Sequence, residues 1–389
     1  MSNTWRTLEP LLEPQERFDR LIARAFGRFG PGLADLSYAN PSDGPSREVL
    51  DVLTRVTSER TGLSLQYTPC GGRTATRRAI ADRLKRDYWL PFQYRDIVLT
   101  SGATSGLNIV LRALFDSSSE VLVLTPHWQD YPVYLRNLGI PARFVPLRRD
   151  KHLDCEAIAD AIGRQTNGIL LSQPCCPTAV MYSPEEITAL CAVLREAEER
   201  LGTKIVLISD EVHRQLVWGQ TPFYSPLRSY PHSVSVYSFG KALSLQGQRI
   251  GYVAVSPRMP GIERVRTALE RCVRLMGFGN PTSLMQYAIC ELLDHQPSLE
   301  ALAARQACVR TELAQYGYEV CPGDATFYVY VKSPDPDDLR FASSLADRGV
   351  VVMPASLFGD PGYIRLSLTA RFDAIERALP TFKAALNDA

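Results

Sequence analysis

The middle of the chain alternates short apolar runs with longer segments in which apolar residues recur every three or four positions. The apolar runs are rich in β-branched residues and alternate little with polar ones, as expected of strands buried on both faces of a parallel sheet. Five such runs occupy residues 96–100, 120–125, 168–172, 204–209 and 233–238. The clearest helical pattern spans 184–201, where Ser183 can cap the first turn. This alternation predicts an α/β domain with a mostly parallel sheet covered by helices.

The pattern changes past about residue 285. Helical segments come first, and three shorter apolar runs and a last helix follow them. The three runs are at 325–331, 350–353 and 363–368. Strands mixed with helices in this way predict a smaller α+β domain, against which the opening residues can pack. We therefore expect a large domain at 46–285 and a small domain made of 1–45 and 286–389.

The composition argues against binding of nucleic acids, membranes and metal ions. The 389 residues include 43 basic and 42 acidic side chains, so no excess of charge points to nucleic acid or to a membrane surface. No apolar run approaches the roughly 18 residues of a membrane span, and the first residues lack a secretory signal, so we expect a cytoplasmic protein. The nine cysteines and five histidines show no metal-ligand spacing, and we expect no metal site.

The strongest candidate for chemistry is Lys241, which follows the apolar run at 233–238. Ligands of parallel α/β sheets bind at the carboxyl ends of the strands, and partial burial there lowers the pKa of a lysine toward a nucleophilic amine. A lone lysine is more often a surface loop residue. However, Arg249 follows between small residues and offers a fixed cation to a phosphate, and Ser238 adds a hydroxyl donor.

Two other strand ends carry suitable groups. Asp210 follows directly on the run at 204–209, and a carboxylate there can pair with a protonated ring nitrogen, although alone it is more readily explained as a helix cap. Gly102, Ala103 and Thr104 lie between a strand and a helix, where small residues bring backbone N–H groups close to an anion. Their spacing differs from dinucleotide-binding and Walker motifs, which argues against both of those sites.

These residues resemble the class I/II aminotransferases of the fold-type I pyridoxal-phosphate enzymes. SFGK at 238–241 followed by RIGY at 249–252 is similar to the S-x-x-K and R-x-G-Y patterns of that family. The resemblance runs from about Leu36 to Leu368, which is nearly the whole chain. It implies a fold like that of aspartate aminotransferase with a seven-stranded sheet, pyridoxal 5'-phosphate as the cofactor, and amino acids and keto acids as substrates.

The resemblance implies a role for each cofactor-binding residue. Lys241 matches the lysine that holds the cofactor as a Schiff base, and Asp210 matches the partner of the pyridine nitrogen. Trp128 matches the aromatic residue that stacks on the cofactor ring, although a core tryptophan would look the same. The matches to the phosphate-binding residues are Gly102, Ala103, Thr104, Ser238 and Arg249.

Two further matches concern the partner subunit and the substrate. Tyr67, in the segment YTPCGG, resembles the tyrosine that reaches the phosphate of the neighbouring subunit, which implies a homodimer with shared active sites. Arg365 matches the arginine that binds the substrate α-carboxylate, a role for which the fork of a guanidinium is suited. An arginine between apolar strand residues is otherwise hard to explain, because burying it unpaired is costly.

Three positions depart from the family pattern, and all three concern the ring oxygen or the substrate side. Cys176 replaces an asparagine that contacts the ring oxygen and the substrate, and a thiol is a poorer donor. His213 replaces a tyrosine that donates to the same oxygen, and an imidazole can also shuttle protons near neutral pH. Ala39 replaces a usual glycine on the substrate side. The segment DEVH at 210–213 also resembles the cystathionine β-lyase branch of this fold, the C–S lyases.

Transamination and elimination therefore both remain open. In either reaction Arg365 holds the amino acid and Lys241 removes the α-proton as general base. Transamination is our first expectation, and β- or γ-elimination is the alternative that His213 and Cys176 suggest. A non-catalytic regulator on this fold usually carries a DNA-binding module, for which the chain has no spare basic segment.

Overall fold

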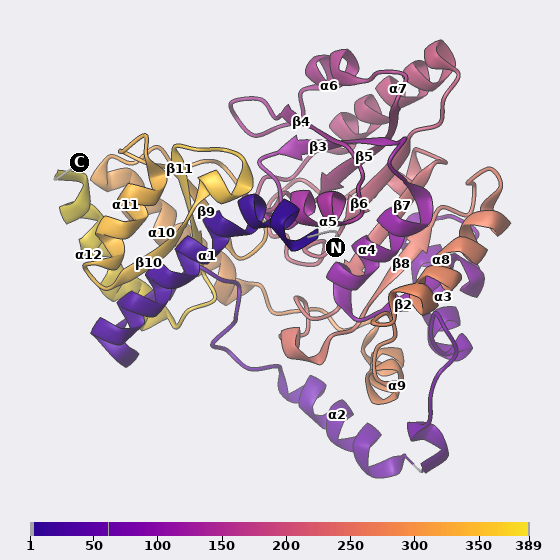
Figure 1. The fold of residues 1–389 in the computed structure, drawn as a ribbon. Coiled ribbons are helices and arrows are strands. Elements are labelled where there is room, and N and C mark those ends of the chain that lie inside the picture. The colour runs from indigo at the N-terminus through magenta and orange to yellow at the C-terminus, as the bar shows by residue number, and fades with distance from the viewer. Residues whose placement is uncertain (1–3, 61, 388–389) are drawn as a thin grey trace.

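The largest element of the computed structural model, which describes residues 4–60 and 62–387, is a seven-stranded sheet (Figure 1). Its strands lie in the order β2-β8-β7-β6-β5-β3-β4, and β8 runs antiparallel to both of its neighbours while the others are parallel. The strands are β2 (Ile97–Thr100), β3 (Glu120–Thr125), β4 (Ala142–Pro146), β5 (Thr166–Ser172), β6 (Val206–Asp210), β7 (Ser233–Ser238) and β8 (Gly251–Val255). The mostly parallel sheet that the apolar runs predicted is confirmed.

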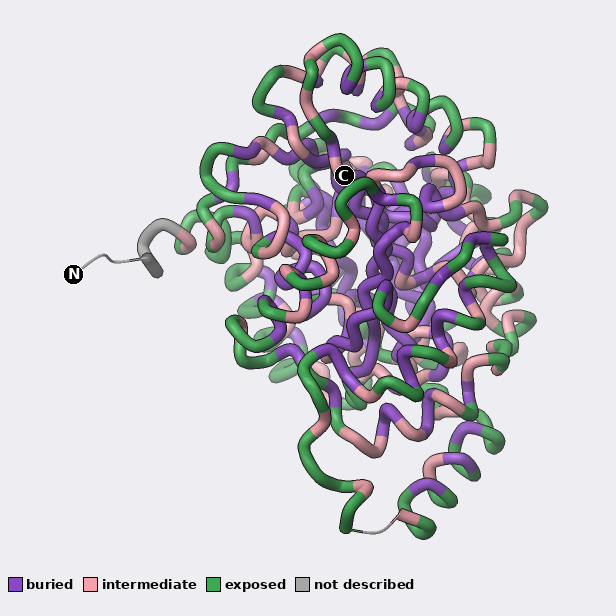
Figure 2. The backbone as a smooth tube through the Cα atoms, turned by 90° about the vertical axis from the view of Figure 1, so that its right-hand side faces the viewer, coloured by how far each residue is buried: buried purple, intermediate pink, exposed green. Residues whose placement is uncertain are grey.

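Helices cover both faces of this sheet. Val98 packs into the apolar cluster on one face, whereas its neighbours Ile97 and Leu99 pack into the cluster on the other. The strands in the middle of this sheet are therefore buried along nearly their whole length, as the purple tube in Figure 2 shows. The helices on the first face are α4 (Gly102–Leu114), α5 (Tyr131–Asn137) and α8 (Ile262–Met276), and those on the second are α2 (Arg47–Glu59), α3 (Thr74–Tyr88), α6 (Cys155–Ala161), α7 (Pro184–Leu201) and α9 (Ser283–Leu292).

A second sheet of four strands joins the two ends of the chain. Its order is β1-β10-β11-β9, and β1 pairs in parallel with β10, more than 300 residues later in sequence. The strands are β1 (Ala34–Leu36), β9 (Tyr328–Lys332), β10 (Val350–Pro354) and β11 (Tyr363–Ser367), and the helices around them are α1 (Thr4–Phe29), α10 (Glu300–Tyr316), α11 (Asp338–Ala346) and α12 (Phe372–Asn387). The expected packing of the opening residues against this part is thus observed, while the boundaries at 45/46 and 285/286 stay a prediction.

The sequence pattern missed three strands and misplaced one. β1 has only three residues, and β4 is an edge strand with one buried side chain, Val145, so neither has a long apolar run. β8 is wholly buried, but its first two residues belong to the RIGY motif, which on the sequence alone indicates only a phosphate site. The run predicted from residue 325 becomes a strand only at Tyr328, because Thr326 adopts φ +63° and turns the backbone.

The predicted cap of α7 is present. The Ser183 hydroxyl accepts a hydrogen bond from the Glu186 N–H at 3.2 Å, and the Glu186 carboxylate accepts one from the Ser183 N–H at 2.8 Å. Such a capping box satisfies two N–H groups that the helix leaves unpaired, and a cap of this kind stabilises by about 1 kcal/mol. At the other end, Gly202 adopts φ +65° and ends the helix.

Neither a membrane span nor a metal cluster is found in the described part of the chain. Among residues 4–60 and 62–387, no helix has the length and apolar character needed to cross a membrane. Within the same described residues, no group of three or more histidine, cysteine or acidic side chains is placed to hold a metal ion. All nine cysteines are free; four of them are buried, and three others pack against the apolar clusters.

Candidate active site

One cavity at the carboxyl edge of the large sheet brings together most of the predicted residues. Asp210 is the last residue of β6 and Ser238 the last of β7, and α4 begins just after β2. These strands run in the same direction, so their carboxyl ends meet at one edge. The cavity, of about 240 Å³, is lined by nine of the predicted residues: Ala103, Thr104, Trp128, Cys176, Asp210, His213, Ser238, Lys241 and Arg249.

One end of the cavity is built to hold an anion. Ala103 and Thr104 belong to the first turn of α4, whose free N–H groups and dipole favour negative charge. The Arg249 guanidinium lies against this turn, because a Cβ added at Gly102 would lie 2.8 Å from its Nη2. Gly102 also adopts φ +81°, so a side chain there would be strained as well as crowded. Arg249 forms no ion pair with any carboxylate of the described chain, which leaves its charge available to a phosphate.

Asp210 is a buried carboxylate held by two donors. The Tyr131 hydroxyl donates to it at 2.7 Å, and the Val212 N–H donates at 3.3 Å. Burial raises the pKa of Asp210 to about 6, although the hydrogen bond from Tyr131 counteracts part of that rise. The carboxylate is therefore ionised at neutral pH and suited to accept a hydrogen bond from a cationic ring nitrogen. Sequence reasoning did not single out Tyr131, which also lines the cavity and lies three residues after Trp128.

Lys241 lies within electrostatic range of Asp210, Arg249 and Arg365. Burial and the charges of the two arginines together lower the pKa of Lys241 to about 8, while the Asp210 carboxylate acts in the opposite sense. A pKa near 8 leaves roughly a tenth of the lysine as free amine at pH 7, about two orders of magnitude more than an ordinary lysine has. The Lys241 Nζ lies 5.6 Å from the centre of the Phe327 ring. A desolvated amine of this kind is nucleophilic.

Arg365 is fully buried without a carboxylate partner in the described residues. One of its Nη atoms donates to the Ser37 carbonyl at 2.9 Å, and its guanidinium lies 4.1 Å from the centre of the Tyr328 ring. Its Nε has no hydrogen-bond partner. A buried unpaired guanidinium is costly, so this arrangement suits a site that receives an anion. Tyr328, another cavity residue, was not singled out in the sequence, where it looked like any aromatic strand residue.

The structure places two of the three departures from the family pattern inside the cavity and the third beside them. The Cys176 Sγ lies 3.9 Å from an Nη of Arg365, and burial raises the pKa of its thiol to about 11. Cys176 is therefore an uncharged thiol. Ala39 packs with Cys176 and Trp128 in one apolar cluster.

His213 is buried, and its ring meets those of Phe327 and Tyr328 edge-on, with 5.7 Å between centres in both cases. Burial lowers the pKa of His213 well below its ordinary value, and the positive charges of Lys241 and Arg365 lower it further. The imidazole is neutral near pH 7, which disfavours a proton shuttle at that pH, and the role of His213 stays a prediction. Its Nδ1 is buried without a hydrogen-bond partner, which leaves a polar atom for a bound group.

Tyr67 is the one predicted cofactor ligand far from the cavity. Its side chain is fully exposed and borders a separate surface hollow beside residues 280–283. The tyrosine was expected to act on a neighbouring subunit, so its role stays a prediction.

The residues around the cavity match pyridoxal phosphate group by group. An arginine and a helix N-terminus suit its phosphate, an ionised Asp210 suits its ring nitrogen, and Lys241 suits its aldehyde carbon. The unpartnered His213 Nδ1 and the indole of Trp128 offer a polar and a stacking contact to the ring. The donor set fits this cofactor.

Comparison with known proteins agrees with this geometry. The family model for aminotransferase class I and II matches residues 32–379. An aspartate aminotransferase of Bacillus subtilis is 26% identical over 374 residues, covering 91% of each chain, and an aspartate/prephenate aminotransferase of Thermus thermophilus is 27% identical, covering 93% of each. Among solved structures, an aminotransferase of Eubacterium rectale superposes with a TM-score of 0.90 at 26% identity, covering 95% of each chain.

Proposed function

Because the chain belongs to the class I and II aminotransferase family, we propose that the cavity at the carboxyl edge of the large sheet is its active site and that Lys241 is its catalytic residue. The enzyme is a pyridoxal-phosphate-dependent aminotransferase that acts on amino and keto acids. The observation that carries the assignment of residues is the meeting of Lys241, Asp210 and Arg249 around one cavity, with Arg365 beside it.

Arg365 and Lys241 act on different groups of the substrate. Arg365 binds the α-carboxylate, which replaces the missing anionic partner of the buried guanidinium. The amine of Lys241 accepts the proton from the α-carbon as general base, and later returns a proton on the way to the keto acid. Bound pyridoxal phosphate supplies the electron sink for the electron pair that the proton leaves behind.

The remaining residues hold the cofactor and tune it. Ser238, Arg249 and the first turn of α4 would hold the phosphate. Asp210 would accept a hydrogen bond from the protonated ring nitrogen, and Tyr131 orients that carboxylate. The indole of Trp128 would offer a stacking surface to the ring. His213 and the Cys176 thiol would serve the ring oxygen and the substrate as neutral groups.

Elimination at the β- or γ-carbon is the less favoured alternative. It was suggested by Cys176 and His213, which depart from the usual asparagine and tyrosine. Both side chains are uncharged at neutral pH, because burial raises the pKa of the thiol to about 11 and lowers that of the imidazole. The thiol is therefore a weak acid and the imidazole lacks its second proton, so both are poor proton donors to a leaving group, and transamination remains the better supported reaction.

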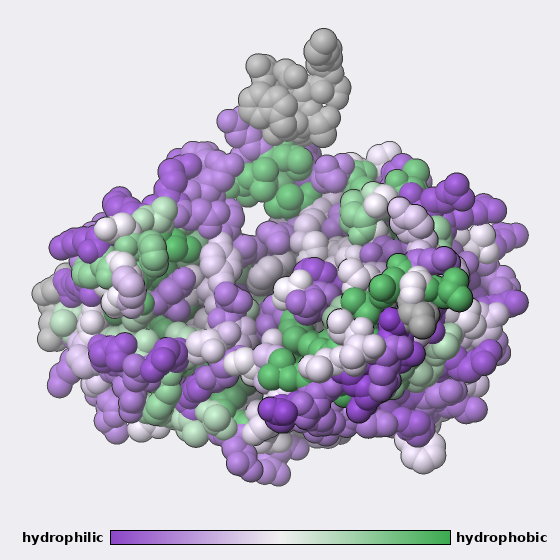
Figure 3. All heavy atoms as spheres, turned by 90° about the horizontal axis from the view of Figure 1, so that it is seen from below, coloured by the Kyte–Doolittle hydropathy of each residue, from purple (hydrophilic) through white to green (hydrophobic). Residues whose placement is uncertain are grey.

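The active site is completed by a second copy of the chain, with Tyr67 of each subunit reaching the phosphate held by the other. Support comes from the exposed apolar residues of the same segment, Leu63 and Leu65, with exposed fractions of 80% and 53%. The side of the molecule that carries α2, shown from below in Figure 3, has hydrophobic patches among hydrophilic residues. Such patches are typical of surfaces that a partner covers. The cytoplasmic location likewise stays a prediction.

The test is chemical trapping of the cofactor. The purified protein loaded with pyridoxal phosphate is expected to be yellow, and borohydride reduction is expected to fix the cofactor covalently on Lys241. Peptide mapping identifies the site, with Lys241→Ala as the negative variant. Lys85→Ala, an exposed lysine on α3, is the matched control and should label as the unaltered protein does. Labelling of a different lysine would refute the assignment.

A further inference from the structure

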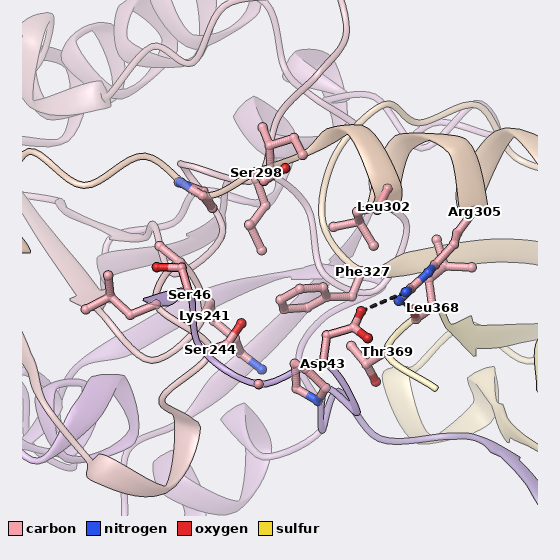
Figure 4. A pocket seen from close by; sticks show the side chains of 18 of the residues that line it. Asp43, Ser46, Lys241, Ser244, Ser298, Leu302, Arg305, Phe327, Leu368 and Thr369 are labelled. Atoms are coloured by element: carbon pink, nitrogen blue, oxygen red, sulfur yellow. Dashed lines mark hydrogen bonds and ion pairs between the residues drawn. The ribbon is translucent and has the colours of Figure 1, made fainter. Parts of the chain in front are cut away.

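A second cavity, of about 270 Å³, lies next to the proposed active site, and we call it the linker cavity (Figure 4). Two connecting segments form its walls: residues 41–46, between β1 and α2, and residues 295–299, between α9 and α10. The first turns of α10 and the loop from Lys241 to Ser244 complete it. The family assignment and the proposed mechanism do not account for this cavity.

The linker cavity adjoins the reacting amine. Lys241 lines both cavities, and Figure 4 shows its side chain reaching into the space beside Phe327. One apolar cluster also spans the boundary between them. It contains Cys176 and Trp128 from the active-site cavity, together with Phe327 and Leu302 from the linker cavity. A substrate whose α-carbon lies at Lys241 therefore has apolar side chains of both cavities beside it.

The lining itself is mostly apolar. Its large side chains come from several parts of the chain: Leu216, Leu243, Leu299, Leu302, Phe327 and Leu368. A cavity of roughly 150 Å³ with such a lining accommodates a benzene ring. The linker cavity is larger, so leucine, methionine and phenylalanine side chains fit its volume and its chemistry.

The charged residues around the linker cavity are already paired, apart from the reacting lysine. Asp43 and Arg305 form an ion pair at 2.7 Å across its wall, and the Arg305 side chain is only 15% exposed (Figure 4). His295 is 2.8 Å from a carboxylate oxygen of Glu48. Within one chain, a second carboxylate on the substrate would have to displace Asp43, which is 63% exposed, from Arg305 or be buried without a partner, and the latter is costly.

We propose that the linker cavity receives the side chain of the amino donor and selects apolar side chains over dicarboxylic ones. This inference rests on the proposed transaminase function and adds the class of substrate to it. It separates this chain from the relatives whose names specify aspartate. Asp43 is then a specificity-determining residue, because it neutralises the cation that a distal carboxylate would need.

The first experiment compares amino donors with the holoenzyme. The change of the visible cofactor band is followed with leucine, methionine, phenylalanine, aspartate and glutamate, and calorimetry compares binding of the unreactive acids 3-phenylpropanoate and succinate. We expect kcat/KM to be at least about tenfold higher for the apolar donors, equivalent to 1.4 kcal/mol, and 3-phenylpropanoate to bind more tightly. Faster reaction with aspartate or glutamate would overturn the inference but leave the transaminase function intact. Retention of the cofactor without reaction of any amino acid would refute the transaminase function itself.

Two variants test the cavity directly. Asp43→Asn leaves Arg305 without its carboxylate and should raise the ratio of kcat/KM for aspartate to that for leucine several-fold. Asp51→Asn removes another exposed ion pair, with Arg47 at 2.9 Å on α2, and should leave the ratio unchanged. Leu302→Trp narrows the cavity and should reduce kcat/KM for phenylalanine more than for alanine. Cofactor retention and melting temperature show that each variant is folded. If Leu302→Trp is folded and slows both donors equally, the side chain does not enter this cavity.

Discussion

Asp210→Asn should make the cofactor-free protein more stable while it damages the holoenzyme. Asparagine has the same shape and still accepts the Tyr131 hydrogen bond, but it carries no charge. In the folded protein, burial raises the pKa of Asp210 from 3.8 to about 6. At about 1.4 kcal/mol per pKa unit, that rise corresponds to about 3 kcal/mol by which the buried charge destabilises the fold.

The pH dependence of this effect has a definite sign. A carboxylate whose pKa is raised in the folded state is protonated below its unfolded pKa of 3.8, and there it does not destabilise the fold. The destabilisation by its charge grows as the pH rises and is complete above about pH 6. The stability gained by Asp210→Asn should therefore grow with pH. About half of the effect is present at pH 5 and nearly all of it at pH 8, so the gain should increase by about 1–1.5 kcal/mol between those values.

The assay is urea unfolding of the cofactor-free protein at pH 5 and at pH 8 for both forms. Asp116→Asn is an informative control, because hydrogen bonds from Ser118 and Ser119 lower the pKa of that exposed carboxylate and its loss should not stabilise. The holoenzyme should show the opposite trend for Asp210→Asn. Losing a charge-assisted hydrogen bond costs about 1.5–3 kcal/mol, so affinity for the cofactor should fall roughly 10- to 150-fold. A stability gain that is the same at both pH values would refute the role assigned to the buried charge.

Three further predictions concern other parts of the site. Arg365→Lys should lower kcat/KM for every amino donor by roughly 10- to 150-fold, because an ammonium cannot bind a carboxylate through two parallel hydrogen bonds. Steady-state kinetics would measure this loss, with cofactor binding unchanged. A loss confined to one donor would contradict the role of Arg365 at the α-carboxylate. Cys176→Asn should lower the pKa at which the visible cofactor band changes, by less than about one unit, because an amide donor stabilises the ionised ring oxygen more than a thiol does. An unchanged spectrophotometric titration would mean that Cys176 does not face the oxygen. Tyr67→Phe should weaken cofactor binding by about tenfold in the dimer, and full retention of cofactor by a dilution-stable monomer would contradict the shared site.

Much of the fold could be predicted because local patterns carry it. The five long apolar runs became β2, β3, β5, β6 and β7 with shifts of at most two residues at their ends, and Ser183 caps α7 as expected. β4 could not be predicted in this way, because an edge strand with one buried residue has no distinctive pattern. β1 is held by pairing with β10 at the far end of the chain, and a three-residue strand has no local signal that would reveal such a partner.

The sequence alone indicated which residues at the strand ends carry the chemistry. The pair SFGK and RIGY, which contains Lys241 and Arg249, indicates the family and the cofactor in combination with Asp210 and Arg365, although none of these residues does so alone. Their electrostatic states depend on tertiary structure, because burial and neighbouring charges come from segments far apart in sequence. That packing lowers the pKa of Lys241 to about 8 and raises that of the Cys176 thiol to about 11.

Tertiary structure alone decided two matters that no motif reports. The first is that His213 is neutral, since its burial against Phe327 and Tyr328 from the C-terminal part of the chain suppresses protonation. The second is the linker cavity, where Asp43 and Arg305 meet across more than 250 residues of sequence. A pairing of charges is a property of distance in space, so the sequence could supply the two side chains but not their ion pair or the apolar cavity that it borders.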